Sequence, residues 1–265
     1  MGDYNFKSIS FNNSVQYRIY KNVVKEGYER QVSFPCDSDG VMIEKERTEK
    51  DIEKSLYSSI NRTKNKIYEY AKSNDWEWFL TFTFDKNVVD RYDYKAVSRK
   101  MIFWLNNVKK LHCPDMKYII VPEFHKDGAV HFHGLLSNCD GLDFIDSGHM
   151  VDGEVIYNVS SYGLGFTTAT KVRDSLKVSG YICKYITKEL CSMGKGFKRY
   201  WASRNLNKPV VEKRFIGGNE KFYAFMELAG DASYLKMVKH PWNEVTYLEF
   251  DHDKGGILDE VDSGM

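Results

Sequence analysis

Two apolar stretches on either side of a short glycine turn constrain the fold of this chain more than any other feature. Residues 116–125 and 130–136 are rich in β-branched and aromatic side chains, and Lys126-Asp127-Gly128 lies between them. Strand-forming segments joined through so short a glycine turn predict an antiparallel β-hairpin. Such short links favour an antiparallel sheet over a parallel one, whose strands need long crossover connections.

The remaining hydrophobic pattern alternates strands with helices. An apolar, aromatic segment predicts a central strand at 78–84, and amphipathic patterns predict helices at 43–72 and 92–111. Further strands are predicted at 15–20, 30–34, 155–159 and 165–170, a Gly/Asp-rich loop at 137–153, and a helix at 175–190. We therefore expect an α+β fold, with a central antiparallel sheet of about five strands and helices packed on one face.

The length of 265 residues is enough for one core domain with extensions. We expect strands and an amphipathic helix in 1–73, the core domain in 74–192, and a basic, then acidic extension in 193–265. No stretch approaches the ~20 apolar residues that span a bilayer, and the N-terminal residues lack the apolar segment of a signal peptide. A cytoplasmic protein without a membrane partner is therefore expected.

Charge is segregated along the chain, although the net charge is only +1. Residues 171–214 contain twelve Lys or Arg and three acids, whereas residues 215–265 contain four Lys and ten acids. The basic segment surrounds 181–185, which favours a nucleic-acid partner there. The five cysteines are scattered and form no Cys-x-x-Cys pair, so neither a disulfide framework nor a thiolate zinc site is indicated.

A candidate metal site lies in the predicted hairpin. His131 and His133 are two residues apart on a strand, so both rings project from the same face. A three-residue turn with Gly128 left-handed places Glu123 across from His131, whereas a two-residue turn moves Glu123 to the opposite face. This nitrogen and carboxylate set suits Mg²⁺ or Mn²⁺, with His125 as the spare ligand. Two histidines that only hydrogen-bond within the sheet are the alternative interpretation.

A second candidate lies in the predicted helix at 175–190. Tyr181 and Tyr185 are four residues apart, as are Lys184 and Lys188, so one helix would present a hydroxyl stripe beside a cationic one. A tyrosine hydroxyl, whose ordinary pKa is about 10, needs a base, metal or cation before it acts as a nucleophile, and nearby lysines lower its pKa. The alternative is an amphipathic helix with the tyrosine rings packed in a core.

Three motifs follow one another along the chain. They are Phe82-Thr-Phe on a strand, then His131-Phe-His-Gly-Leu-Leu, then Tyr181-Ile-Cys-Lys-Tyr-Ile-Thr-Lys-Glu. Their order resembles the motifs of HUH replication initiators, over residues 76–189, and is most similar to the rolling-circle initiators of single-stranded DNA bacteriophages and related plasmids. The resemblance implies an endonuclease that nicks single-stranded origin DNA, leaves a 5′-phosphotyrosine and a free 3′-OH, and later rejoins the strand.

The resemblance also implies roles for particular residues and partners. The expected metal ligands are Glu123, His131 and His133, the nucleophiles are Tyr181 and Tyr185, and the cationic assistants are Lys184 and Lys188. If only one tyrosine acts, Tyr185-Ile-Thr-Lys-Glu resembles the single-tyrosine form. The implied partners are single-stranded origin DNA, a host helicase and a polymerase in the bacterial cytoplasm. The Arg, Lys and aromatic residues of 197–206 fit single-strand binding.

Other interpretations remain open. An HUH relaxase or transposase would share the same motifs. A metal protein of the cupin kind also has a histidine strand, but Leu136 and Ser137 stand where that family has a glutamate. A basic DNA-binding module with packed tyrosines would need no chemistry at all. No Gly-x-x-x-x-Gly-Lys-[Ser/Thr] motif occurs, so no ATPase domain is expected.

Overall fold

The computed structural model describes residues 2–26, 48–193, 197–239 and 243–251. The chain divides into two compact units, one of Arg47–Lys208 and one that joins Met1–Glu46 to Pro209–Met265. These boundaries differ from those expected at 73 and 192, because the long helix before residue 73 and the segment up to 208 belong to the same unit as the core. The strand expected at 30–34 and the helical residues expected at 43–47 lie outside the described residues.

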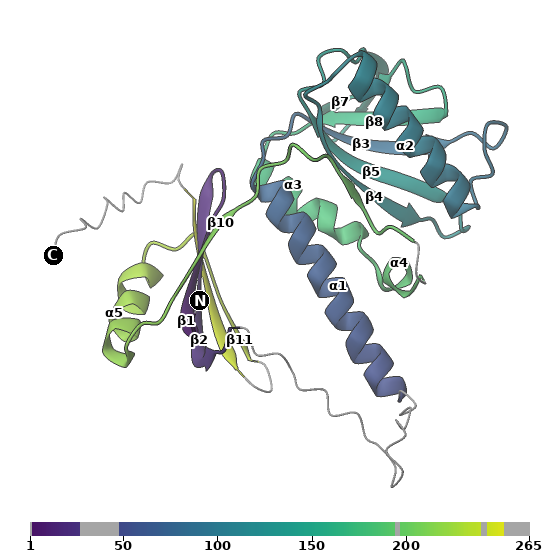
Figure 1. The fold of residues 1–265 in the computed structure, drawn as a ribbon. Coiled ribbons are helices and arrows are strands. Elements are labelled where there is room, and N and C mark those ends of the chain that lie inside the picture. Colours follow the sequence, from purple (N-terminus) through teal and green to yellow (C-terminus); the bar gives the residue numbers. More distant parts are fainter. Residues whose placement is uncertain (1, 27–47, 194–196, 240–242, 252–265) are drawn as a thin grey trace, which may run out of the picture. The chain divides into compact units, whose positions relative to one another are not determined.

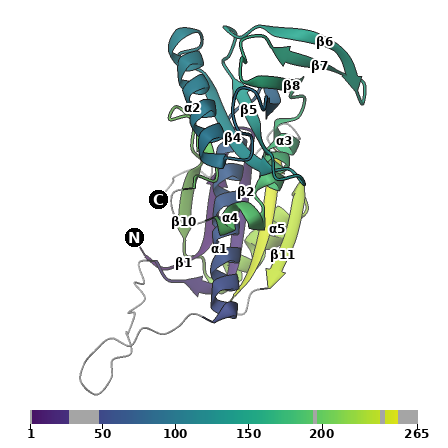
Figure 2. The same cartoon turned by 90° about the vertical axis from the view of Figure 1, so that its right-hand side faces the viewer.

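A seven-stranded antiparallel sheet forms the centre of the Arg47–Lys208 unit. Its order is β6-β7-β8-β3-β5-β4-β9, and Figure 2 shows β6, β7 and β8 along one edge. The expected α+β class is confirmed, with seven strands rather than about five. The strands are β3 (Trp78–Phe84), β4 (Lys117–Phe124), β5 (Val130–Ser137), β6 (Phe144–Val151), β7 (Glu154–Val159), β8 (Gly165–Lys171) and β9 (Trp201–Ala202).

Helices cover both faces of this sheet, rather than the one face that we expected. Helix α2 (Tyr94–Leu111) lies across one face (Figure 1), and α1 (Glu49–Lys72) and α3 (Ser175–Ile182) pack on the other, where their buried residues join Ile119 and Val121 in a separate core cluster. The physical reason is that the central strands are apolar on both sides: Ile119, Ile120 and Val121 are consecutive in β4 and all fully buried. A strand buried on both faces needs a helical layer on each. None of the described helices is long and apolar enough to cross a membrane.

The loop expected at 137–153 contains strand β6, so that expectation was wrong for 144–151. Val151 pairs with Glu154 across a turn of two residues, Asp152 and Gly153. Both turn residues have positive φ, 51° and 77°. This conformation matches the right-handed twist of the flanking strands, and Asp-Gly is among the sequences that adopt it most readily. Gly148 and Gly153 therefore belong to a hairpin.

The second unit is a five-stranded antiparallel sheet built from both ends of the chain. Its order is β10-β1-β2-β12-β11, in which β12 near the C-terminus pairs with β2 near the N-terminus. Phe6, Ile19 and Leu248 form its core, and α5 packs on them through Phe225 and Leu228. The elements are β1 (Tyr4–Ser10), β2 (Ser14–Val24), β10 (Val210–Arg214), α5 (Gly218–Ala229), β11 (Tyr234–Lys239) and β12 (Glu244–Asp251). The strand expected at 15–20 lies within β2.

Helix α2 offers a direct test of the packing on its face of the sheet. Leu105 is 1% exposed in the core, whereas Phe103 on the same helix is 67% exposed. We expect Leu105→Ala to lower the free energy of unfolding by about 2–5 kcal/mol, because it removes buried methyl groups and leaves a cavity. Phe103→Ala should change it by less than about 0.5 kcal/mol. Urea denaturation of both variants checks this, and equal losses would contradict the assignment.

Candidate active site

The β4–β5 hairpin brings Glu123 to the two histidines. The His125 amide donates to the Ala129 carbonyl at 2.8 Å, so the turn contains three residues, and Gly128 has φ +85°. This register pairs Glu123 with His131. The three-residue turn with a left-handed glycine, on which the metal interpretation depended, is therefore confirmed.

Strand β3 orients both imidazole rings. Thr81 Oγ1 lies 3.0 Å from Nδ1 of His133, and Thr83 Oγ1 lies 3.2 Å from Nδ1 of His131. Each histidine is therefore held through Nδ1, which directs its Nε2 away from β3. Sequence reasoning missed these threonines. Alternation along a strand puts residues 81 and 83 on the same face, and that signal would have found them once β3 was paired with β5.

Glu123 bonds the more buried of the two histidines. Its Oε2 lies 2.6 Å from Nε2 of His133. A carboxylate only accepts hydrogen bonds, so Nε2 carries the proton, and in a neutral ring Nδ1 then accepts from Thr81. The exposed His125 stacks on the ring of His131, with 4.7 Å between ring centroids. The structure therefore brings together all three expected ligands and the spare one.

The donor set has the chemistry of a hard-cation site, although its present arrangement is a hydrogen-bonded one. Burial lowers the pKa of both histidines below the ordinary value, and Glu123 opposes this effect at His133. Burial thus favours the neutral imidazole that binds metals. Among the described residues, no group of three His, Cys, Asp or Glu side chains is arranged to hold an ion. A metal at His133 would have to displace both the Nε2 proton and its bond to Glu123.

The two tyrosines converge on the same face of the sheet. The ring of Tyr185 stacks on that of His133, with centroids 3.6 Å apart and planes 13° apart. The Tyr185 hydroxyl donates to the Tyr181 hydroxyl at 3.1 Å. Phe79 of β3 contacts both tyrosine rings, with centroids 5.2 Å from Tyr181 and 6.3 Å from Tyr185. Residues that are more than forty positions apart in sequence thus form one cluster.

The helix expected at 175–190 is broken, which separates the two lysines. Helix α3 ends at Ile182, a 3₁₀ turn covers Cys183–Tyr185, and α4 begins at Lys188. The break occurs because Thr187 caps α4 by accepting from the Leu190 amide at 3.2 Å, while Ile186 is extended and buried.

The expected cationic stripe on one continuous helix was therefore wrong. Lys184 Nζ lies 4.4 Å from the centre of the Tyr181 ring. Lys188 is exposed in α4, and no contact joins it to either tyrosine among the described residues. Of these two lysines, Lys184 is the one that contacts Tyr181 or Tyr185 within the described part of the chain.

The two hydroxyls have different surroundings. Burial raises the pKa of Tyr185 well above its ordinary value, and the Tyr181 hydroxyl and the negative charge of Glu123 act in the same direction. The chain's own groups therefore hold Tyr185 protonated at neutral pH. Tyr181 is 42% exposed and stands at the surface of the cluster.

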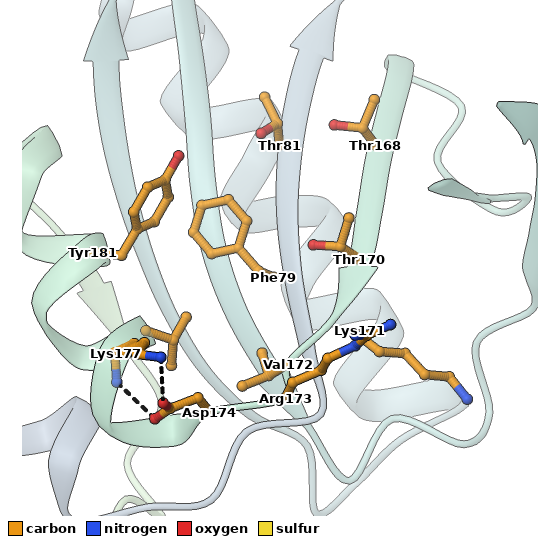
Figure 3. A pocket seen from close by; sticks show the side chains of 11 residues that line it. Phe79, Thr81, Thr168, Thr170, Lys171, Val172, Arg173, Asp174, Lys177 and Tyr181 are labelled. Atoms are coloured by element: carbon orange, nitrogen blue, oxygen red, sulfur yellow. Dashed lines mark hydrogen bonds and ion pairs between the residues drawn. The ribbon is translucent and has the colours of Figure 1, made fainter. Parts of the chain in front are cut away.

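A cavity of about 470 Å³ opens beside Tyr181. Figure 3 shows the hydroxyls of Thr81, Thr168 and Thr170 turned toward Phe79 and Tyr181. Three cationic residues also line the cavity: Lys171, Arg173 and Lys177. The hydroxyls of Thr168 and Thr170 and the Lys171 cation suit the phosphates and sugars of a nucleic-acid strand, whereas Arg173 and Lys177 are paired with Glu154 and Asp174.

Comparison with known proteins gives one match. Residues 77–190 match the family model of the replication-associated protein ORF2/G2P. The match covers less than half of the chain, lies within the Arg47–Lys208 unit, and includes every candidate ligand, tyrosine and lysine of the site. The unit that carries this site is therefore similar to replication-associated proteins. Searches of curated proteins and of solved structures find no significant match.

The contact between Glu123 and His133 can be tested by NMR. We expect Glu123→Gln to lower the pKa of His133 further. In the unaltered protein the Glu123 carboxylate raises this pKa and so opposes burial, which lowers it. A pH titration of the ring resonances measures this shift. Glu154→Gln, which removes the carboxylate paired with Arg173, should leave the pKa of His133 unchanged. A His133 pKa that rises or stays constant in Glu123→Gln would contradict the contact.

Proposed function

We propose that this chain is a rolling-circle replication initiator of the HUH type, which nicks and rejoins single-stranded origin DNA. The observation that carries the proposal is the stacking of Tyr185 on His133, which holds two tyrosine hydroxyls over the face that bears Glu123 and His131. A tyrosine packed only for stability would not need a hydrogen-bonded imidazole beneath it. The match to replication-associated proteins over the same residues supports the proposal.

Mg²⁺ or Mn²⁺ would be held by Glu123, His131 and His133, with His125 as the spare ligand. Once bound, such an ion supplies Lewis-acid polarisation of a phosphate oxygen. The protein's part is orientation: Thr81 and Thr83 fix the rings through Nδ1, and at His133 the ion would take the Nε2 position that Glu123 now occupies.

The proposed reaction is a transesterification. A tyrosine Oη attacks the phosphorus atom and loses its proton, the new P–Oη bond forms, and the bond between phosphorus and the 3′ oxygen breaks. The departing oxygen takes a proton and becomes a free 3′-OH, while the 5′ end stays on the tyrosine. Attack by a 3′-OH reverses these steps and closes the strand. Lys184 beside Tyr181 offsets the negative charge that develops.

The close approach of the hydroxyls supports a reaction that uses both tyrosines. Because the two oxygens are 3.1 Å apart, either reaches a phosphate placed over the histidines. The first can hold the 5′ end while the second acts on another strand. In this function a host helicase supplies melted origin DNA and a polymerase extends the 3′-OH in the bacterial cytoplasm.

The proposal predicts metal-dependent covalent capture of DNA. A pool of random single-stranded oligonucleotides, incubated with the full chain and Mn²⁺, should yield protein–DNA adducts that survive boiling in detergent. Sequencing the captured 5′ ends would then identify the nick site. A complete absence of adducts across the pool, with Mg²⁺ as well as Mn²⁺, would overturn the proposed function.

Tyrosine variants decide which hydroxyl acts. If both tyrosines act, Tyr181→Phe and Tyr185→Phe should each keep some capture and the double variant should lose at least about 100-fold, because no nucleophile remains. Tyr57→Phe, which alters an exposed tyrosine of α1, is the matched control. Gel quantification of the adduct measures the effect. Unchanged capture by the double variant would contradict the assignment of the nucleophiles.

Histidine variants test the metal ligands. His131→Ala combined with His133→Ala should abolish capture and weaken Mn²⁺ binding, measured by electron paramagnetic resonance, by about 10–100-fold or more. The resonance measurement reports metal binding without requiring activity. His149→Ala, which changes a histidine on β6, should leave both signals unchanged. Normal Mn²⁺ binding by the double histidine variant would show that the ion binds elsewhere.

A further inference from the structure

A large groove lies along β9, the edge strand of the seven-stranded sheet. Its volume is about 1440 Å³, and its lining comes mainly from α1, α2 and the segment around β9. It shares no lining residue with the cavity beside Tyr181. On β4, the groove reaches Tyr118, whereas Glu123 lies near the other end of that strand. The groove is therefore a separate site from the tyrosine cluster.

The groove is strongly cationic. No acidic residue is among the described residues that line it. Five cations do line it, namely Lys109, Lys198, Arg199, Arg204 and Lys208. Lys198, Arg204 and Lys208 are exposed, and within the described part of the chain no carboxylate forms an ion pair with them. An uncompensated row of positive charge in a concave surface attracts a polyanion.

Residues 197–208, which carry four of the five cations, are held in place by hydrogen bonds on both sides of β9. Arg199 donates to the Cys191 carbonyl at 3.1 Å and to the Ser59 hydroxyl of α1. After the strand, Asn205 Nδ2 donates to the Asp115 carbonyl at 2.9 Å. The exposed cations are therefore presented on fixed backbone, which reduces the entropy lost when a ligand binds.

Aromatic rings line the same groove as these cations. Tyr70, Tyr118, Phe197 and Tyr200 are half-buried and line the groove. Partly exposed rings between cations are the arrangement with which proteins bind single strands, because unpaired bases stack on the rings while the cations contact the phosphates. A duplex hides the faces of its bases, and an acidic peptide has no bases to stack.

We propose that this groove binds single-stranded DNA at a distance from the tyrosine site and so anchors the strand on which that site acts. This inference rests on the proposed function only for the choice of DNA as the strand. The groove therefore has two separable contributions to binding: an electrostatic one from its exposed cations and a stacking one from its rings.

The electrostatic contribution is tested by removing the three exposed cations. The full chain carrying Lys198→Ala, Arg204→Ala and Lys208→Ala should bind a fluorescent mixed-sequence 30-mer at least about tenfold more weakly in fluorescence anisotropy. The slope of log affinity against log salt should decrease by about 2, since each phosphate contact on a single strand contributes about 0.7. Lys50→Ala, Lys86→Ala and Lys100→Ala remove as many exposed charges outside the groove and should have little effect. Equal losses in the two variants would overturn the proposal.

Competitors identify the chemistry of the ligand. Oligo-dT should displace the 30-mer, whereas poly-glutamate of equal charge should not, and an abasic strand of the same length should bind about tenfold more weakly, because it cannot stack. Poly-glutamate that competes as well as oligo-dT would overturn the proposal in favour of an acidic protein partner. Oligo-U that binds more tightly than oligo-dT would overturn the choice of DNA.

The two proposals fail in different experiments. The Tyr181→Phe, Tyr185→Phe double variant should lose covalent capture but still bind the 30-mer, with an affinity that Lys198→Ala, Arg204→Ala and Lys208→Ala lower at least about tenfold in that background. Cross-linking of a bromodeoxyuridine strand to the double variant should map by mass spectrometry to residues 197–208. Cross-links confined to the tyrosine cavity would overturn the groove proposal, and a lack of adducts with intact groove binding would overturn only the proposed nicking.

Discussion

The register of the β4–β5 hairpin is the constraint on which the candidate site depends. Gly128 in the left-handed conformation allows a three-residue turn, and this turn pairs Glu123 with His131. A shift of one residue would move the carboxylate to the opposite face of the sheet, where α2 packs. The 2.6 Å contact between Glu123 and His133 is a consequence of this one turn.

The rest of the site depends on how a helical layer meets this sheet face. Ile186 is buried and extended, so the chain leaves the 3₁₀ turn directly after Tyr185 and restarts as α4. This break leaves the Tyr185 ring on His133 and places Lys188 in a separate helix, α4. The same layer that buries apolar residues thereby sets which tyrosine is packed against the histidines and which is exposed.

Much of the fold could be predicted because its signals are local. The hairpin, the central strand at 78–84 and helix α2 follow from hydrophobic periodicity and turn residues. The β6–β7 hairpin was equally local, since Asp152-Gly153 is a strong turn signal, but the many surrounding glycines and aspartates concealed it. The pairing of β12 with β2 had no such signal, because those strands are more than 200 residues apart and are joined only by tertiary contacts.

By itself, the sequence determined the antiparallel hairpin, the residue types of the site and the common face of His131 and His133, because turn chemistry and strand alternation are local properties. Only the tertiary structure decided that Thr81 and Thr83 orient these rings and that Tyr185 stacks on His133. It also decided that a cationic groove forms at β9, where α1, α2 and residues 197–208 meet. Those contacts join residues distant in sequence, and their geometry follows from how layers pack rather than from any local preference.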